Sequence, residues 1–538
     1  MKNTVGKFQK GDIYLSRFPF TSYEQFKIRP VVVFAEDKTY QDVVVMAISS
    51  VLRGWNPSSV VYVLSGEIDF ESTGLKKDSC VLVNRIASIR EDRLFHQLGR
   101  LPAKLIKKIE KHILYNLKIG CSEQKEGSFI PYGKQSIDTK DVYSVVETLR
   151  SDWITQGPKV SEFEQAVANY CQVDHAVAVN SGTSALHITC RALDVGEGDI
   201  VWTTPITFVA SANCARYCGA KVDYVDIDPH TYNMSVKALE ANLDEAERTG
   251  KLPKVVIPVH MCGQSCEMAE IAELAQRYGF AVIEDASHAI GGYYKNEPVG
   301  NCRYSDIAVF SFHPVKIITT AEGGMAVTNN YELADRMSLL RSHGITREIS
   351  ENGKLRAYSL EWETKSDPSH SSSSKFSTSQ PPSWYYQQID LGYNYRMTEL
   401  QAALGFSQLQ RLDEFVARRQ ELAARYDRLL ADFPLITPWQ HPDAHSAWHL
   451  YVIRLKLEEI GPSRREVFDY LRQQGIGVNV HYIPVHTQPF YQSQGFKHNQ
   501  YPEAEQYYQE AITLPLFPAM NEEEQDKVIN TLQEALKK

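Results

Sequence analysis

The sequence lacks any run of 18 or more consecutive apolar residues, the length that a membrane-spanning helix needs. Its first residues, MKNTVGKFQKGD, lack the apolar stretch of a secretory signal peptide. The nine cysteines include no CxxC pair and no spacing typical of a disulfide framework or a zinc site. We therefore expect a cytoplasmic protein with no membrane-embedded part, no metal site and reduced thiols.

Two cysteine pairs nevertheless have a spacing of four residues, Cys214 with Cys218 and Cys262 with Cys266. His260 stands close to the second pair, so a metal site there is one interpretation. Buried reduced thiols are the simpler one, because free cysteine behaves as a small apolar residue.

Charge is unevenly distributed along the 538 residues. Residues 1–119 contain 19 Lys and Arg against 12 Asp and Glu, a balance of +7, within a total of −9. The remainder, with 38 against 54, therefore has a balance of −16. This length and asymmetry predict two or three domains, the first of which is compatible with an anionic partner such as nucleic acid.

The first part of the chain is rich in short β-branched runs, such as RPVVVFAE and DVVVMAISS, separated by turn-forming residues. This pattern between Lys10 and Arg100 predicts a small β-barrel. Residues 101–117 then have apolar side chains at helical spacing. We expect a first domain over residues 1–120.

Beyond the polar stretch 121–128, short apolar runs alternate with amphipathic helical segments, which predicts a mainly parallel, doubly wound α/β sheet over residues 129–383. Residues 348–383 interrupt it with DPSHSSSSKFSTSQPPS, whose composition cannot supply a core and predicts a surface insertion. Residues 384–538 begin with a long helical pattern and continue as a mixed α+β segment, the third expected domain.

Three of the expected strands are followed by chemically useful groups. In an open α/β sheet, ligands bind at the carboxyl ends of the strands. The segment SGTSALH places Gly182 and Thr183 at a helix start, where free N–H groups bind phosphate, although a simple helix cap explains the same letters. Asp285 ends a second strand, and Ser311 and Lys316 follow a third.

Together these groups are the parts that pyridoxal phosphate needs. A lysine forms the Schiff base, a carboxylate keeps the pyridine nitrogen protonated and a helix start holds the phosphate. Phe208 offers an aromatic face for the ring, and Gly323 with Gly324 allow the chain to turn back into the sheet. Taken alone, Lys316 is equally explained as a solvated or ion-paired lysine.

The ordered motifs NSGTSALH, TTPITFVASAN, VIEDASHAIGG, SFHPVKIITTAEGG, GYNYRMTELQAALG and VNVHYIPVH resemble those of the DegT/DnrJ/EryC1/StrS family of sugar aminotransferases. The resemblance covers about residues 129–538. Within the family it is strongest to the transaminases of pseudaminic acid biosynthesis, through the TTAEGG and VHYIP stretches. It implies the fold of type I pyridoxal-phosphate-dependent aminotransferases with a smaller C-terminal α+β domain.

The resemblance implies a role for each matching residue. Lys316 would bind the cofactor covalently and shuttle the proton, Asp285 would pair with the pyridinium nitrogen, and His288 would lie near the ring's hydroxyl side. Gly182, Thr183 and Ser311 would hold the phosphate.

Further residues are implied for a shared site. Asn394, in GYNYRM, would complete the phosphate pocket across a homodimer interface, and Arg396 would assist substrate binding. The resemblance also implies nucleotide-sugar contacts by Tyr132, Lys134, His481 and Tyr482, although a satisfied structural role explains His481 equally well.

The implied reaction transfers an amino group from glutamate to C4 of a UDP-linked 4-keto-6-deoxy sugar. Lys316 favours transamination, because relatives with histidine there perform dehydration. Another nucleotide-linked 4-keto sugar is the alternative substrate. Two features depart from the family pattern, Cys262 and the serine-rich insertion, which stands just before GYNYRM and bears on substrate access.

The first domain resembles the MazF/PemK-type toxins, small SH3-like barrels that cleave RNA, through KGDIYLSRFPF, KIRPVVVF and VVVMAISS. The implied RNA-cleavage residues are Arg29, before a proline, and Ser49, where the family usually has threonine. A guanidinium can hold a phosphate and stabilise developing charge. An active ribonuclease as the chain's main role, an RNA-binding or dimerising module, and a remnant barrel remain alternatives.

Overall fold

The computed structural model of the protein describes residues 8–19, 26–37, 42–53, 59–66, 69–116, 129–346, 384 and 386–537. It divides the chain into two compact units, Met1–Glu126 and Gly127–Lys538. The stretch 121–128 and the serine-rich insertion 348–383 lie outside the described residues. The boundary expected between residues 383 and 384 stays a prediction.

The first unit contains an antiparallel six-stranded sheet in the order β4-β5-β3-β2-β1-β6. Helix α1 packs against β4 and β5, and its Ile109 and Ile113 share a buried cluster with Ile13 and Val81 of the sheet. The small β domain and its closing helix are thus confirmed. The elements are β1 (Asp12–Pro19), β2 (Phe26–Asp37), β3 (Asp42–Ser49), β4 (Val60–Val63), β5 (Ser79–Arg90), β6 (Leu94–Arg100) and α1 (Ala103–Asn116).

The larger unit is built on a seven-stranded sheet in the order β7-β15-β14-β11-β10-β8-β9. Strand β15 is antiparallel to both neighbours, whereas the remaining pairs are parallel, as the alternating sequence pattern predicted. The strands are β7 (His175–Val179), β8 (Ile200–Thr203), β9 (Lys221–Tyr224), β10 (Val255–Ile257), β11 (Ala281–Asp285), β14 (Ile307–Ser311) and β15 (Gly324–Thr328).

Both faces of this sheet are covered by helices. Val177 and Val179 of β7 join a buried cluster with α4 and α5, while Ala178 joins a different cluster with α3 and α9. Because successive side chains of a strand point to opposite faces, the two clusters are two cores, one on each side. The helices are α2 (Thr139–Leu149), α3 (Pro158–Cys171), α4 (Gly182–Ala192), α5 (Ala210–Tyr217), α6 (Val236–Thr249), α7 (Met268–Tyr278), α8 (Tyr331–Arg341), α9 (Glu399–Leu409) and α10 (Leu412–Leu430).

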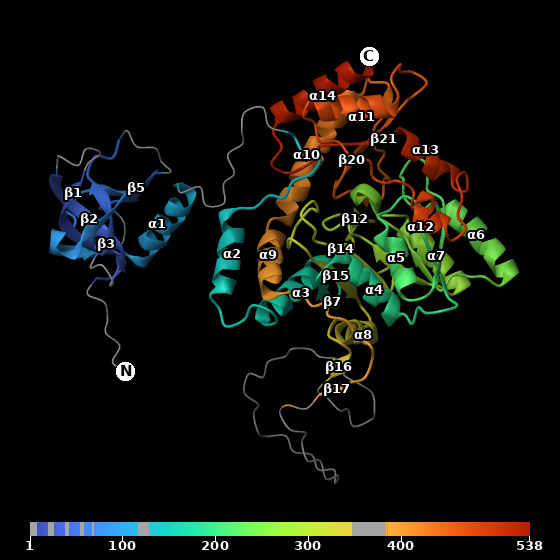
Figure 1. Cartoon of the computed structure of the whole chain (residues 1–538), viewed down its shortest axis with the longest axis horizontal. Helices are drawn as coiled ribbons and strands as arrows, with labels where there is room; N and C mark the ends of the chain where they lie inside the picture. The colour runs from blue at the N-terminus through green and yellow to red at the C-terminus, as the bar shows by residue number, and fades with distance from the viewer. Residues whose placement is uncertain are drawn as a thin grey trace, which may run out of the picture. The chain divides into compact units, whose positions relative to one another are not determined.

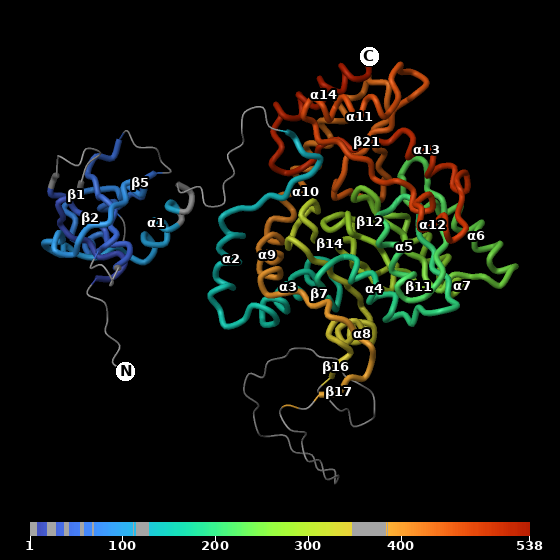
Figure 2. Tube along the Cα trace, in the orientation of Figure 1, coloured from blue at the N-terminus to red at the C-terminus, as the bar shows by residue number. Residues whose placement is uncertain are grey.

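The C-terminal part continues from α10 into a smaller sheet, in the order β18-β20-β21, which shares a third core with α11 and α14 (Figure 1). The chain trace in Figure 2 follows this orange and red segment at one end of the unit. Its elements are β18 (Leu435–Ile436), β20 (Tyr451–Leu455), α11 (Arg464–Gln473), α12 (Pro489–Gln492), α13 (Pro502–Glu510), β21 (Ala511–Leu514) and α14 (Glu522–Leu536). The predicted α+β character is confirmed.

Minor strands complete the unit: β12 (Tyr293–Tyr294), β13 (Glu297–Pro298) and β19 (Ala444–His445) form one small sheet, and β16 (Ile345–Thr346) pairs with β17 (Gln387–Gln388).

Across the residues that the structure describes, no helix is long and apolar enough to cross a membrane.

Candidate active site

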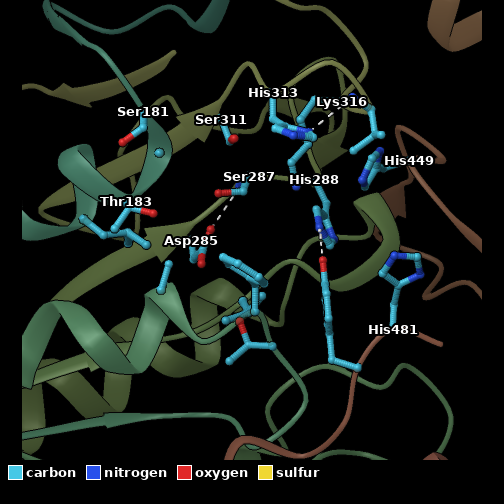
Figure 3. A pocket seen from close by; sticks show the side chains of 18 of the residues that line it. Ser181, Thr183, Asp285, Ser287, His288, Ser311, His313, Lys316, His449 and His481 are labelled. Atoms are coloured by element: carbon cyan, nitrogen blue, oxygen red, sulfur yellow. Dashed lines mark hydrogen bonds between the residues drawn. The ribbon is translucent and has the colours of Figure 1, made fainter. Parts of the chain in front are cut away.

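A cavity of about 510 Å³ lies where β7, β11 and β14 end. Parallel strands bring their carboxyl ends to one edge, so three loops that are distant in sequence meet there. Ten of the predicted residues line the cavity: Tyr132, Gly182, Thr183, Phe208, Asp285, His288, Ser311, Lys316, His481 and Tyr482. Figure 3 shows hydroxyl side chains on one side of the cavity and imidazoles on the other.

The hydroxyl side is the start of helix α4. Ser181 caps the helix by accepting the N–H of Ser184, which leaves the N–H groups of Gly182 and Thr183 as the unbonded donors of the first turn. A side chain at Gly182 would lie 2.9 Å from Cβ of Ser311. Glycine therefore lets the helix start approach the Ser311 hydroxyl, and the resulting donor cluster suits a phosphate.

The paired glycines after Lys316 serve close approach rather than turning. Neither Gly323 nor Gly324 has a positive φ. A Cβ on Gly324 would lie 2.5 Å from the carbonyl carbon of Ser181, because β15 runs beside the chain that leads into α4. The prediction that the paired glycines allow the chain to turn is therefore wrong. Glycine is needed at position 324 because a side chain there would clash with the backbone of Ser181.

Asp285 ends β11 with its carboxylate buried at the wall of the cavity. The hydroxyl of Ser211 donates to Oδ2 over 2.5 Å, and the backbone N–H of Ser287 donates to Oδ1 over 3.2 Å. These two donors fix the direction of the carboxylate. Asp285 can therefore accept a further hydrogen bond from a protonated ring nitrogen.

Lys316 lies in the loop between β14 and β15. Burial lowers the pKa of its ammonium group from 10.5 to about 8, against an opposing influence of Asp285. A lysine with this pKa has an appreciable neutral fraction near pH 7, which a nucleophilic amine requires. The interpretation of Lys316 as a solvated surface lysine is not supported by this environment.

Two buried imidazoles face each other beside Lys316. The ring centroids of His288 and His449 are 4.4 Å apart, and Nε2 of His288 is 3.1 Å from the hydroxyl of Tyr482. Burial, with Lys316 adding to it, holds the pKa of both histidines well below the ordinary value. Both rings are therefore neutral at pH 7. Nδ1 of His288 is buried without a partner among the described residues.

His449 is held by its backbone. Arg419 of α10 is 1% exposed, and its Nη1 donates to the carbonyls of Trp448 (3.2 Å), His449 (3.2 Å) and Leu516 (2.9 Å). Trp448 itself has a φ of 49°. A bulky residue with a positive φ is strained by roughly 1–3 kcal/mol. The fold therefore tolerates a strained backbone conformation next to His449.

His481 has partners on both ring nitrogens. Its Nδ1 is 2.7 Å from the hydroxyl of Thr513, and its Nε2 is 3.3 Å from the amide of Asn479. Burial together with Lys316 lowers its pKa to about 3. The ring is thus neutral and satisfied within the chain, as the structural interpretation expected, although it also lines the cavity against Tyr132.

Three predicted residues lie outside the cavity: Lys134, Asn394 and Arg396. Asn394 and Arg396 form bridges to Ser342 and Val179, on a segment that runs beside the end of β7. Their predicted roles in substrate binding and in a partner's pocket stay predictions.

Sequence reasoning missed several residues that line the cavity: Ser287, His313, Glu322, His449 and Asn479. Four of them stand within or beside a recognised motif, so proximity to Asp285, Lys316 or His481 was an available signal. His449 had none, because only the packing of α10 and the chain after β19 brings it to His288.

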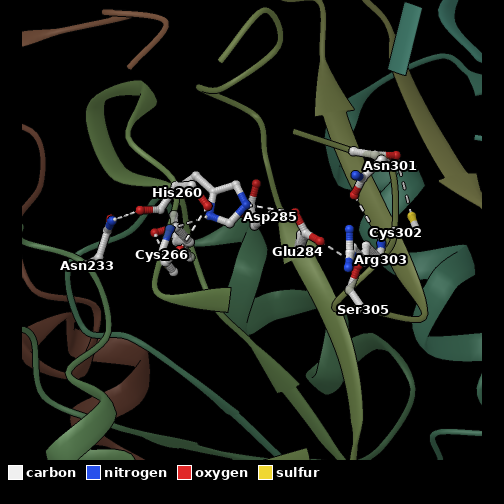
Figure 4. Close-up of polar contacts among 12 residues, drawn as sticks. Asn233, His260, Cys266, Glu284, Asp285, Asn301, Cys302, Arg303 and Ser305 are labelled. Atoms are coloured by element: carbon white, nitrogen blue, oxygen red, sulfur yellow. Dashed lines mark hydrogen bonds and ion pairs between the residues drawn. The ribbon is translucent and has the colours of Figure 1, made fainter. Parts of the chain in front are cut away.

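The side chains around the second cysteine pair bond to nearby backbone groups. No group of three or more His, Cys, Asp or Glu suited to a metal ion occurs in the described part of the chain. Nδ1 of His260 accepts a hydrogen bond from the backbone N–H of Cys266 (Figure 4). The thiol of Cys266 donates to the carbonyl of Val259. The cysteines described are free, and all but Cys218 are buried.

In the first unit, Arg29 lies on β2 and Ser49 ends β3. The antiparallel register pairs Val31 with Ala47. Arg29 and Ser49 each stand two residues beyond that pair, so both side chains belong to the same face of the sheet. Burial lowers the pKa of Arg29. The guanidinium nevertheless stays charged at any physiological pH, because the ordinary pKa of arginine is far above that range.

The residues of the cavity fit pyridoxal phosphate. The open N–H groups of α4 with Ser311 suit its phosphate, Asp285 suits its ring nitrogen, and the unpartnered Nδ1 of His288 is available to a polar ring substituent. When bound, this cofactor supplies an electron-withdrawing ring for amine transfer. A lysine placed as Lys316 is can supply a nucleophilic amine and move a proton at the reacting carbon.

Comparison with known proteins agrees with this chemistry. The sequence model of the DegT/DnrJ/EryC1/StrS aminotransferase family matches residues 135–533. Spore coat polysaccharide biosynthesis protein SpsC of Bacillus subtilis is 39% identical over 421 residues, which are 77% of this chain and 99% of SpsC. The UDP-4-amino-4,6-dideoxy-N-acetyl-beta-L-altrosamine transaminase of Campylobacter jejuni is 38% identical over 411 residues, 76% of this chain and 98% of that enzyme.

Solved structures show the same relationship. PseC of Helicobacter pylori, an aminotransferase involved in the biosynthesis of pseudoaminic acid, superposes with a TM-score of 0.64 at 30% identity, covering 76% of this chain and 99% of PseC. Spr1654 of Streptococcus pneumoniae in its PLP form gives a TM-score of 0.64 at 29% identity, covering 76% of this chain and 98% of that one.

The model of the PemK-like, MazF-like toxins of type II toxin-antitoxin systems matches residues 9–117, in agreement with the small β domain. Three findings on the larger unit point to the same family. They are the ordered motifs, the lysine and carboxylate at one edge of the sheet, and the relatives that match along nearly their whole length. The chain belongs to the DegT/DnrJ/EryC1/StrS family, and its larger unit is a pyridoxal-phosphate-dependent aminotransferase of the type I fold.

Proposed function

We propose that the larger unit transfers an amino group from glutamate to C4 of a UDP-linked 4-keto-6-deoxy sugar, as in pseudaminic acid biosynthesis. The observation that carries this substrate is the 38% identity to the C. jejuni altrosamine transaminase along 98% of that enzyme. The cavity of about 510 Å³ is in the range of pockets that enclose small organic ligands.

Within this proposal each cavity residue has a task. Gly182, Thr183 and Ser311 hold the phosphate, Asp285 pairs with the ring nitrogen and Phe208, 58% exposed, offers its face to the ring. His288 contacts the ring's hydroxyl.

The nucleotide sugar enters beside Tyr132, Tyr482 and His481, which line the cavity together. Lys134 and Arg396 complete this entry in the proposed complex.

The substrate is tested with a panel of UDP-, GDP- and dTDP-linked 4-keto-6-deoxy sugars, with glutamate as the donor. We expect glutamate-dependent amino sugar and one equivalent of 2-oxoglutarate from the UDP compound, and none with Lys316→Ala. Lys237→Ala, on the exposed surface of α6, is the matched control. Amination of only the GDP or dTDP sugars would refute the UDP assignment while leaving the aminotransferase intact.

We also propose that the active enzyme is a homodimer in which Asn394 completes the partner's phosphate pocket. Support comes from its segment, which lies beside the end of β7 but outside the chain's own cavity. Mixing Lys316→Ala with Asn394→Ala chains tests this. A shared site regenerates one intact pocket in each mixed dimer and restores activity, whereas a site made within one chain leaves the mixture inactive.

For the first unit, we propose contact with RNA. The toxin family match over residues 9–117 favours it, as does the placement of Arg29 and Ser49 on one face of the sheet. Incubation of single-stranded RNA with the full chain and with Arg29→Ala measures both cleavage and binding. Cleavage lost with Arg29→Ala supports a ribonuclease, binding without cleavage supports an RNA-binding module, and neither from the wild type removes the proposal.

A further inference from the structure

Three thiols meet where helices α4 and α5 pack against each other. Cys190 lies in the last turn of α4, and Cys214 and Cys218 lie one turn apart at the end of α5. Cys190 and Cys214 are fully buried in the core that the two helices share, and the partly exposed Cys218 packs against this core. The cofactor site described above uses none of these thiols. Sequence spacing pairs only Cys214 with Cys218, and folding adds Cys190 to them.

The hydrogen bonds of this cluster give its thiols different roles. Sγ of Cys214 donates to the carbonyl of Ser211 over 3.2 Å, back along its own helix. The hydrogen bond with Cys190 holds the pKa of Cys218 well below its ordinary value, although burial opposes this shift. Contacts with Cys214 and Cys218, together with burial, raise the pKa of Cys190 well above its ordinary value. Cys218 is therefore the thiolate of the cluster, and Cys190 keeps its proton.

The surroundings of Cys218 are those of a reactive cysteine. His187 of α4 is buried, with its ring centroid 5.4 Å from that of Tyr217 and its Nδ1 3.1 Å from the hydroxyl of Tyr395. Nε2 of His187, buried without another partner in the described ranges, is left for the thiol of Cys218. The positive charge of Arg191 lowers the pKa of Cys218 further. Partly exposed thiolates beside such groups react with oxidants, whereas buried thiols are inert.

We propose that Cys218 and Cys190 form a peroxide-reactive dithiol that closes to a disulfide between α5 and α4. The thiolate sulfur of Cys218 attacks one oxygen of hydrogen peroxide, the O–O bond breaks, and the other oxygen leaves as hydroxide and takes up a proton to become water. Cys218 is then a sulfenic acid. The sulfur of Cys190 attacks it, the S–S bond forms, and the remaining oxygen leaves as water with the proton of the Cys190 thiol. The two sulfurs together lose two electrons to the peroxide.

The resolving thiol is Cys190 rather than Cys214. The thiol of Cys214 is bonded to the backbone of its own helix, whereas Cys190 has the largest influence on the thiol of Cys218. A bond between the helices also joins two parts of the cofactor site. Helix α4 begins with the open N–H groups of the phosphate site, and Ser211 of α5 donates to Asp285. Oxidation would therefore fasten together the two helices that hold these groups.

The first test uses the reduced full chain, treated with a small molar excess of hydrogen peroxide at pH 7. Thiols are then counted in urea with Ellman's reagent, and the digested protein is mapped by mass spectrometry. We expect the count to fall from nine to seven, because one disulfide consumes two thiols. The map should contain one linked pair of peptides, which joins Cys190 to Cys218 and separates with dithiothreitol. A count that stays at nine, or oxidation confined to other cysteines, would overturn the proposal.

Variants assign the two roles. Cys190→Ala should form no disulfide and should retain Cys218 as a sulfenic acid, which dimedone traps. Cys218→Ser should lose no thiols at the same dose of peroxide. Cys171→Ala removes a buried helical cysteine in the other core, so this matched control should still lose two thiols.

The alternative outcomes are equally distinct. A wild-type disulfide between Cys214 and Cys218, or a disulfide that survives Cys190→Ala, would refute the role of Cys190. Loss of two thiols from Cys218→Ser would refute the role of Cys218. Circular dichroism establishes that each variant folds, and because the wild-type map needs no substitution, it decides the proposal even if a variant does not fold.

Discussion

Replacement of Lys316 by methionine should make the cofactor-free enzyme more stable at pH 7. Burial lowers the pKa of Lys316 from 10.5 to about 8, so at pH 7 the folded protein holds a charge in a site that disfavours it. This difference corresponds to about 3 kcal/mol of native-state free energy. Methionine has a similar length and no charge, so it removes the penalty and keeps the packing.

The pH dependence gives the prediction its sign. Between about pH 8 and 10.5, Lys316 is protonated in the unfolded chain but neutral in the folded one, so wild-type stability rises with pH across this window. The advantage of the methionine variant is therefore greatest below pH 8 and disappears near pH 10.5. The same lowered pKa leaves roughly 10% of the amine neutral at pH 7, compared with about 0.03% for an ordinary lysine.

The assay is urea unfolding of the cofactor-free full chain, followed by fluorescence at several pH values from 7 to 10. Lys237→Met, an exposed lysine of α6, is the matched control and should match the wild type throughout. Equal unfolding midpoints for wild type and Lys316→Met at pH 7, or a difference that grows with pH, would show that burial does not lower this pKa.

Three further substitutions probe the cavity and its support. Asp285→Asn should reduce the transamination rate by at least about 100-fold, because the ring nitrogen loses its anionic partner; a rate within tenfold of wild type contradicts the assignment. Gly182→Ala, whose Cβ would lie 2.9 Å from Cβ of Ser311, should weaken pyridoxal phosphate binding, with a Kd raised about tenfold by fluorescence titration, and an unchanged Kd argues against a phosphate site there. Arg419→Met leaves three buried carbonyls without their donor and should lower the free energy of unfolding by at least about 2 kcal/mol, whereas Arg428→Met on the exposed side of α10 should not.

Local sequence patterns were sufficient for the elements and for the order of the chemistry. The β-branched runs before residue 100 predicted β1 to β6, and the helical spacing after it predicted α1. Both patterns can be read from the order of apolar and polar residues alone. Alternation of strand and helix predicted the parallel sheet, and the rule that loops at the carboxyl ends bind ligands placed Asp285, Ser311 and Lys316 in one site. Motif resemblance then supplied the family and the cofactor.

The tertiary structure decided what depends on contacts between distant segments. No local pattern indicates that Arg419 of α10 holds Trp448 and His449, or that His449 packs on His288, because these residues meet only when the C-terminal part folds against the main sheet. The reason for Gly324 was likewise steric, since the close neighbour is Ser181, far away in sequence.

Protonation states show the same division. The sequence determined which groups can titrate at the site, because it supplies Lys316, Asp285 and the histidines in order. Burial and hydrogen-bond direction determine which of them are charged, and both are properties of the folded chain. Desolvation in the cavity, which only the folded chain provides, lowers the pKa of Lys316 to about 8.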